Sequence, residues 1–301
     1  MSLRPQNWDE LMGLTRSVIG TKSQKEVLME KARTGNVRVL FFVGPSGTGK
    51  TSAARIFAAN FFGIDYSLID EASYGDGTGY PYYMEKNASG ERGIDVIRRL
   101  VGTFISTGTD NDKPRILVFD EADGLTPQAQ NILRATTEQY SYNCIFIFCL
   151  NNIDKMHDAL ISRASIFYFD PLSKDVSVEW LLDKAVLSNI TIGRDVAEDV
   201  VEYYRGDLRK VANSFISTYT GMEVTKWEPR PTYAEEIYTA ENRQETYLAL
   251  AEEHYIEAGE LLRDLLRLND WKNPIPFGQA LLMIKADPMI GILYALNEGL
   301  K

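Results

Sequence analysis

The chain has 301 residues, of which 45% are hydrophobic and 25% are charged, and its formal net charge is −10 at pH 7. This composition is typical of a globular protein long enough for two or three hydrophobic cores, and the acidic balance disfavours non-specific binding of nucleic acid by the whole surface. Because neither a long apolar run nor a charged-then-apolar leader occurs, we expect no membrane span and no secretion signal. A local basic patch remains compatible with these numbers.

The sequence contains two cysteines, Cys144 and Cys149, which flank the apolar run IFIF. Its two histidines, His157 and His254, have no partners at the spacing of metal ligands. We therefore expect buried thiols, no zinc site and a reducing intracellular compartment, cytoplasmic or, in a eukaryote, nuclear.

The first predicted elements lead into a glycine-rich loop. Residues 23–34 predict a helix that Gly35 ends, and residues 37–43 (VRVLFFV) predict a buried strand. The loop and an amphipathic helix over residues 51–63 come next. Residues 64–86 are polar and rich in glycine and tyrosine, and we interpret 70–83 as a surface insertion without an assigned role.

Three further apolar runs predict strands that end in polar residues: RILVFDEAD, NCIFIFCLNN and SIFYFD, at 115–123, 143–152 and 165–170. Because strands alternate with helices, we expect an α/β core with a mostly parallel sheet, flanking helices and a functional site along the carboxyl edge.

Beyond Pro171 the hydrophobic periodicity becomes helical. Residues 172–224 predict a small helical domain, a polar passage at 225–236 predicts a linker, and the remainder is helical again. We therefore divide the chain into an α/β core at 1–171, a helical domain at 172–224 and a second helical domain at 225–301.

Residues 44–51 (GPSGTGKT) match G-x-x-x-x-G-K-[ST] between a predicted strand and a predicted helix. In such a P-loop, backbone N–H groups cradle phosphate oxygens, Lys50 neutralises the β- and γ-phosphates, and Thr51 binds Mg²⁺. The alternative, an ordinary glycine-rich turn, does not account for both neighbouring elements. The predicted ATP-binding residues here are Gly44, Pro45, Ser46, Gly47, Thr48, Gly49, Lys50, Thr51 and Ser52.

The strand that ends in DEAD carries two adjacent carboxylates. Asp120 can hold Mg²⁺, and Glu121 can polarise a water for attack on the γ-phosphate. The following strand ends in Asn151 and Asn152, and an amide at Asn151 can orient water beside the phosphate, although asparagine at a strand end is often a turn residue. Together these residues predict ATP hydrolysis rather than binding alone.

Arg163 stands just ahead of the predicted strand at 165–170. A strand entering a core needs no guanidinium there, so Arg163 is either a solvated charge or a group that reaches something this chain does not supply.

Taken in order with SRA (162–164) and GDLR (206–209), these motifs resemble those of the AAA+ ATPases. NASGERGIDVIRRL (87–100) is similar to the NASDERG segment of clamp-loader small subunits of the replication factor C type. RPQNWDELMG (4–13) and LTPQAQNILRATTEQYSYNCIFIFCLNN (125–152) resemble further stretches of that family. The similarity spans about residues 4–215, and the missing zinc-type cysteines favour the archaeal, eukaryotic or viral branch.

The resemblance implies an AAA+ core followed by a helical lid region (172–224) and an all-helical collar region (225–301) that holds a ring of five subunits together. It implies an ATPase that works at subunit interfaces, with ATP and Mg²⁺, to open a ring-shaped sliding clamp and load it on primer–template DNA. The implied partners are the other subunits, the clamp and the DNA, with no membrane.

Residue by residue, the resemblance gives catalytic roles to Lys50, Glu121 and Asn151. It makes Arg209 a second sensor that reaches the γ-phosphate of its own site, and Arg163 an arginine finger that acts in trans in a neighbour's site. Arg4 and Pro5 match the segment that lines the adenine pocket.

Three departures from the family pattern stand out. Ala164 replaces the cysteine of the family's Ser-Arg-Cys, Gly90 replaces an aspartate in NASDERG, and the insertion at 70–83 is long.

In the family, the helices after NASGERG and after DEAD line a central chamber and follow the DNA backbone. Arginines there would contact phosphates without reading bases, whereas the alternative is a solvated charged face. The predicted DNA-binding residues are Arg92, Arg98, Arg99 and Arg134.

Two other functions would use the same ATP residues. An AAA+ motor such as a branch-migration helicase gives no reason for NASGERG. A scaffold subunit that barely hydrolyses ATP gives no reason for Lys50, Glu121 and Arg163 to occur together.

Overall fold

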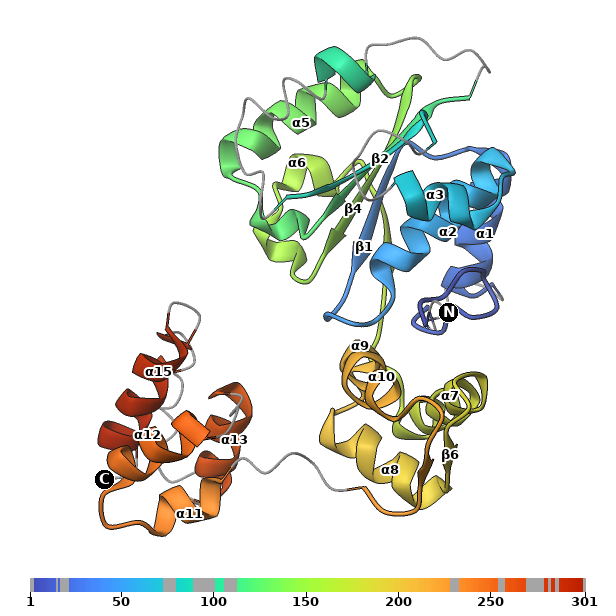
Figure 1. Ribbon diagram of the computed structural model, residues 1–301. Coiled ribbons are helices and arrows are strands. Elements are labelled where there is room, and N and C mark those ends of the chain that lie inside the picture. The colour runs from blue at the N-terminus through green and yellow to red at the C-terminus, as the bar shows by residue number, and fades with distance from the viewer. Residues whose placement is uncertain are drawn as a thin grey trace. The chain divides into compact units, whose positions relative to one another are not determined.

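The computed structural model describes residues 3–14, 16, 22–72, 80–88, 101–105, 113–227, 233–253, 258–268, 279–280, 283–284 and 287–299. Two compact units divide the chain, Met1–Trp227 and Glu228–Lys301, and each is described by itself (Figure 1). The predicted DNA contacts Arg92, Arg98 and Arg99 lie outside the described residues, as does part of the predicted insertion, residues 73–79.

The first unit is built on a five-stranded sheet in the order β2-β3-β4-β1-β5, and every pairing in it is parallel. Its strands are β1 (Val39–Val43), β2 (Tyr83–Asn87), β3 (Arg115–Asp120), β4 (Cys144–Leu150) and β5 (Ser165–Tyr168). The predicted parallel α/β core is confirmed. Since all strands run in the same direction, their carboxyl ends meet at one edge of the sheet.

Hydrophobic side chains fill both faces of this sheet. Along β1, Leu40 and Phe42 belong to one buried cluster and Phe41 to the other, as expected for alternating side chains. Helices α1, α2 and α3 lie on one side of the sheet and α5 and α6 on the other (Figure 1). Their bounds are α1 (Gln24–Thr34), α2 (Lys50–Phe62), α3 (Tyr66–Ala72), α5 (Pro127–Gln139) and α6 (Asp158–Ile161).

Local signals explain where the flanking helices begin and end. At α1, the Ser23 side chain accepts the N–H of Glu26 while the Glu26 carboxylate accepts the N–H of Ser23, and left-handed Gly35 (φ 66°) closes the helix, as predicted. At α5, Thr126 accepts the N–H of Ala129 and Pro127 occupies the first turn.

The edge strand β2 was not predicted. In its sequence, YMEKN, three consecutive polar residues follow Tyr83 and Met84, and Tyr83 alone is buried, so it lacks the continuous apolar run of the central strands. The structure places α3 within residues 64–86 and β2 across the end of that stretch, and the interpretation of 70–83 as a surface insertion is wrong at Tyr83, which is buried.

The lid region packs its own small core around Leu181, Val200 and Phe215. It contains α7 (Lys174–Leu187), β6 (Thr191–Ile192), α8 (Arg194–Tyr203), α9 (Leu208–Lys210), a helical turn (Val211–Ile216), α10 (Ser217–Tyr219) and β7 (Glu223–Val224). The two-residue strands β6 and β7 pair in parallel, which the helical periodicity did not predict.

Trp227 keeps the chain attached to the first unit as far as the third residue of the predicted linker. The centroid of its ring lies 5.4 Å from that of Tyr203 and 6.2 Å from that of Phe215. The boundaries at 171/172 and 224/225 remain predictions, because the first unit holds both the α/β core and the lid region.

The second unit is helical where it is described. Its helices are α11 (Ala234–Thr239), α12 (Arg243–Glu253), α13 (Ala258–Leu268), α15 (Pro288–Tyr294) and a final turn (Ala295–Gly299). On α13 the leucines at 261, 262, 265 and 266 are all buried, which is the spacing of one helix face.

Candidate functional site

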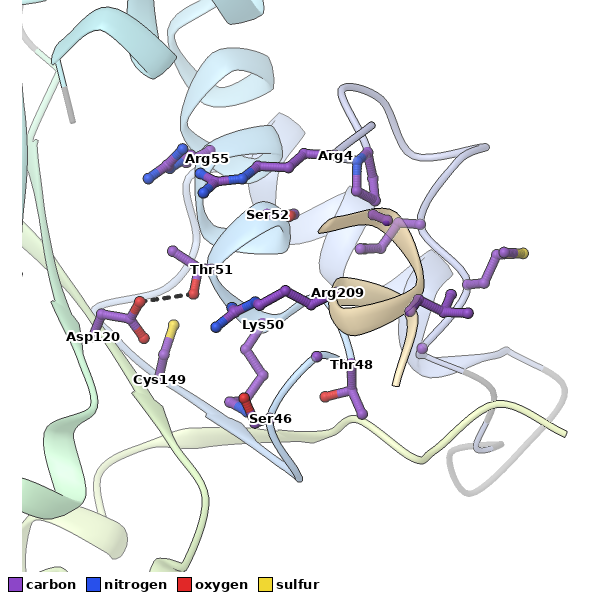
Figure 2. A pocket seen from close by; sticks show the side chains of 18 of the residues that line it. Arg4, Ser46, Thr48, Lys50, Thr51, Ser52, Arg55, Asp120, Cys149 and Arg209 are labelled. Atoms are coloured by element: carbon purple, nitrogen blue, oxygen red, sulfur yellow. Dashed lines mark hydrogen bonds between the residues drawn. The ribbon is translucent and has the colours of Figure 1, made fainter. Parts of the chain in front are cut away.

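A cavity of about 620 Å³ opens at the carboxyl edge of the sheet (Figure 2). Its walls come from the N-terminal segment, the P-loop with the start of α2, the ends of β2, β3 and β4, and the lid region. The predicted site residues that line it are Arg4, Pro5, Ser46, Gly47, Thr48, Gly49, Lys50, Thr51, Ser52, Asp120, Glu121, Asn151 and Arg209.

The P-loop is held in a shape that larger residues would not adopt. A Cβ on Gly44 would lie 2.1 Å from the backbone oxygen of Phe169, and Gly49, which precedes α2, has φ 93°. The loop therefore leads directly into the N-terminus of a 13-residue helix, whose unpaired N–H groups favour an anion.

Lys50 joins the P-loop to the end of β4. Its Nζ donates to the backbone oxygens of Gly44 and Pro45 at 2.6 and 2.7 Å and to Oδ1 of Asn151 at 3.1 Å. Burial lowers the pKa of Lys50. An anion in the cavity would stabilise the charged form, so the ammonium group is suited to a phosphate.

Thr51 and Asp120 place two oxygen groups side by side. The Thr51 hydroxyl donates to Asp120 Oδ2 at 2.9 Å, a bond drawn in Figure 2. Burial raises the pKa of Asp120, and the nearby Glu85 carboxylate adds to that rise. A nearby cation would stabilise the charged form of this carboxylate. Mg²⁺ is usually bound by one or two protein oxygens together with phosphates and water, so the Thr51 hydroxyl and the Asp120 carboxylate are suitable ligands.

Glu121 follows Asp120 in an uncommon backbone conformation. Its φ is 52°, in the left-handed region, and its N–H donates to Asp120 Oδ1 at 3.0 Å. The side chain is exposed at the cavity, so water can reach the carboxylate.

Asp123, the last acid of DEAD, was not predicted as a site residue. Its Oδ1 accepts the N–H of Asn151 at 3.3 Å, and its Oδ2 lies 3.6 Å from Nζ of Lys155. Asp123 thereby ties the turn after β3 to the end of β4, where Asn151 meets Lys50.

Arg209 enters the cavity from the lid region. Asp207 caps its short helix by accepting the N–H groups of Arg209 and Lys210 at 3.1 and 3.2 Å. In Figure 2 the Arg209 side chain extends from this helix toward Lys50. The structure thus brings the predicted second sensor to the P-loop of its own chain.

Arg163 lies elsewhere and does not line this cavity. It follows α6, where its Nη1 donates to the backbone oxygen of Ala159 at 2.6 Å and its Nη2 pairs with Glu138 Oε1 at 2.6 Å. Its side chain is 42% exposed. The guanidinium is therefore neither fully solvated nor part of the site in its own chain.

Arg134, the described member of the predicted DNA-binding set, lies on α5 with 45% of its side chain exposed. Its Nη1 is 4.0 Å from Oε1 of Glu138, one helical turn away.

Arg55 and Glu85 also line the cavity and were missed from the sequence. Arg55 is buried in α2, and its Nε and Nη2 donate to the two oxygens of Glu85, each at 2.9 Å, while Nη1 pairs with Asp70 at 2.6 Å. Burial opposes the charge of Arg55, but its hydrogen bonds to Glu85 raise its pKa above the ordinary value. An arginine within the apolar stretch AARIFAA was the available signal, because a buried charge requires a partner.

Among the described residues, no group of three or more His, Cys, Asp and Glu side chains could hold a metal ion unaided. Within that same part of the chain, the helices are too short or too polar to cross a bilayer.

The family model for the ATPase family associated with various cellular activities (AAA) matches residues 40–172. The chain is 31% identical over 271 residues to the replication factor C small subunit of Sulfolobus acidocaldarius, a match that covers 87% of this chain and 74% of that protein. For the small subunit of Archaeoglobus fulgidus the identity is 32% over 270 residues, covering 87% and 76%. For that of Haloarcula marismortui it is 34% over 210 residues, covering 70% and 58%.

Among solved structures, a RuvB variant of Thermotoga maritima is similar with a TM-score of 0.57 and 17% identity, covering 99% of this chain and 91% of that one. At this identity the likeness concerns the AAA+ fold alone.

Proposed function

This chain belongs to the replication factor C small-subunit family of AAA+ ATPases, and from that premise we propose that it is an ATPase subunit of a sliding-clamp loader in DNA replication. In this proposal ATP hydrolysis at subunit interfaces drives opening of the clamp and its loading on primer–template DNA. The observation that carries it is the single cavity that gathers the P-loop, Asp120, Glu121, Asn151 and Arg209.

The residues of the chain divide the work of phosphoryl transfer. The P-loop amides and Lys50 bind and orient the phosphates, while Glu121 and Asn151 hold the attacking water in line. Arg209 adds positive charge from the lid region. Mg²⁺, held by Thr51 and Asp120, would neutralise charge on the phosphates.

We further propose that hydrolysis uses a cation from a neighbouring subunit, in addition to Lys50 and Arg209 of the cavity itself. We assign Arg163 to this role in the site of a neighbouring subunit, since Arg163 is partly exposed and lies outside the cavity. An arginine finger of this kind accelerates hydrolysis by roughly 10³–10⁵-fold. The proposed partners are therefore further subunits in a ring, with the collar region as the assembly domain.

The remaining proposed partners are the clamp and the DNA, inside the cell. A few arginines per subunit, repeated around a ring, suffice for phosphate contact despite a net charge of −10. Arg134 on α5 is exposed for such contact, and Arg92, Arg98 and Arg99 complete the proposed set.

The test is ATP hydrolysis by the assembled complex with the sliding clamp and primed DNA from the same genome. We expect stimulation that requires both, and its loss in Lys50→Ala, which removes the phosphate-binding ammonium group. Stimulation by DNA alone, accompanied by strand unwinding, would instead support a helicase and overturn the clamp-loader proposal.

A further inference from the structure

The carboxylate of Glu138 lies between two arginines that have separate proposed roles. Its Oε1 is 2.6 Å from Nη2 of Arg163 and 4.0 Å from Nη1 of Arg134. The side chains of Arg163, Arg134 and Glu138 are 42%, 45% and 45% exposed, so solvent reaches all of them. Such an exposed arrangement contributes little to stability, and its value lies in geometry.

Glu138 fixes the part of the Arg163 guanidinium that its own segment does not hold. On the Nη1 side, contacts are local: the backbone oxygen of Ala159 at 2.6 Å and the hydroxyl of Ser162 at 3.5 Å. On the Nη2 side Arg163 pairs with Glu138, which belongs to α5 rather than α6. Two anchors on different elements leave a planar guanidinium little freedom to rotate.

We propose that Glu138 is a positioning residue for Arg163, and that it couples DNA contact at Arg134 to the orientation of Arg163. This inference rests on the proposed function, because it takes Arg163 as the finger and Arg134 as a phosphate contact.

The coupling follows because one carboxylate interacts with two guanidinium groups. When a DNA phosphate binds Arg134, the interaction between Arg134 and Glu138 weakens, and the ion pair between Glu138 and Arg163 becomes stronger. The effect is reciprocal: when Arg163 binds in the neighbouring site, the strength of the interaction between Glu138 and Arg134 changes. The two arginines are therefore connected through a single side chain at the end of α5.

The first test is Glu138→Gln in the assembled complex, which keeps the shape of the side chain and removes its charge. We expect kcat for ATP hydrolysis to fall about tenfold, since a misplaced catalytic group costs up to about a hundredfold, while KM for ATP stays within about twofold. Glu138→Asp, which restores the charge on a shorter side chain, should recover part of kcat. An unchanged kcat in Glu138→Gln overturns the proposal.

The second test asks whether Glu138 acts through Arg163. In an Arg163→Ala background, Glu138→Gln should produce no further loss of hydrolysis. A loss by the same factor as in the unmodified chain would show that Glu138 acts independently of the finger.

The third test measures, at a saturating DNA concentration, the factor by which DNA stimulates ATP hydrolysis. Arg134→Gln should lower the factor by which DNA stimulates hydrolysis, and it should have no such effect when Glu138 is already Gln. Equal effects in both backgrounds would remove the coupling from the proposal.

The matched control is Glu30→Gln, which breaks the exposed Lys22–Glu30 pair, 2.7 Å long with side chains 60% and 50% exposed. We expect it to leave hydrolysis unchanged, and we expect both variants to have a thermal unfolding midpoint close to that of the unmodified chain.

If the assembly hydrolyses ATP without responding to clamp and DNA, the proposed function fails. The double variant at Glu138 and Arg163 still tests whether Glu138 positions Arg163.

Discussion

Arg163 is the residue on which the proposal of a site shared between subunits rests. Its guanidinium pairs with Glu138 at 2.6 Å and stays away from the cavity that holds Lys50 and Arg209. From the sequence, its position before a strand raised the question, and the family resemblance supplied the trans role. The contact with Glu138 could not be predicted, because it depends on how α6 packs beside α5.

Arg163→Ala is expected to leave ATP binding by the isolated subunit intact, since the residue does not line that subunit's cavity. Hydrolysis by the assembled ring should fall by roughly 10³-fold or more, because the neighbour's site loses its finger. Equilibrium titration with a fluorescent ATP analogue and steady-state hydrolysis measure the two quantities.

The isolated subunit is its own control for that variant. If Arg163→Ala weakens nucleotide binding in a strictly monomeric preparation, the residue acts in cis and the trans assignment is wrong.

Arg55 marks a limit of prediction at the residue scale. The sequence gives an arginine within an apolar helix, which indicates that a partner exists. The partner, Glu85, lies 30 residues away on β2, a strand with no continuous apolar run. Without that strand in the predicted sheet, neither the ion pair nor its place in the cavity wall could be derived.

Among the elements, α5 connects to the loop that follows β4 through one buried glutamine. Nε2 of Gln130 donates to the backbone oxygens of Leu125 and Lys155 at 3.2 and 3.0 Å, and Oε1 accepts the N–H of His157 at 2.7 Å. That loop begins at Asn151, so Gln130 links α5, which carries Arg134 and Glu138, to the strand end at the cavity.

Gln130→Leu should lower the free energy of unfolding by about 2 kcal/mol or more, because a similar volume remains while buried backbone groups lose their partners. Urea unfolding of the isolated subunit measures the change.

Gln128→Leu on the exposed side of the same helix is the matched control, with an expected change within about 0.5 kcal/mol. Equal urea midpoints for the two variants would mean that the Gln130 hydrogen bonds contribute little to the fold.

The strands of the sheet differ in how far the sequence predicts them. β1, β3, β4 and β5 follow from apolar runs, and the P-loop pattern places the site between β1 and α2. The edge strand β2 depends on pairing with β3, where Asn87 is opposite Asp120, and such a tertiary contact leaves no mark in a polar pentapeptide. The sequence accordingly predicts the site residues well where they lie in one continuous segment, such as the P-loop, and poorly where they come together from distant segments.

At the scale of the whole molecule, the charge balance sets the conditions for DNA binding. With a net charge of −10, the protein repels a polyanion unless basic side chains are concentrated where the DNA passes. Binding should therefore depend on assembly, which repeats the same few arginines around a ring.

Arg98→Glu is expected to weaken binding of the assembled complex to primer–template DNA and to reduce the dependence of the binding constant on salt, because phosphate contacts release counterions. Fluorescence anisotropy across a salt series measures both quantities.

The control is Arg33→Glu, on the last turn of α1, which changes the net charge by the same amount. If the two variants weaken DNA binding equally, the effect comes from overall charge, and Arg98 makes no phosphate contact.

The hydrogen bonds of Lys50 have a consequence for which ligands the cavity prefers. Its ammonium group already donates to three neutral oxygens, so an incoming phosphate exchanges acceptors rather than adding them. The number of hydrogen bonds stays nearly constant in such an exchange, and the favourable binding free energy comes from replacing neutral acceptors by charged ones. Selection among nucleotides at this lysine is then a selection by anionic charge.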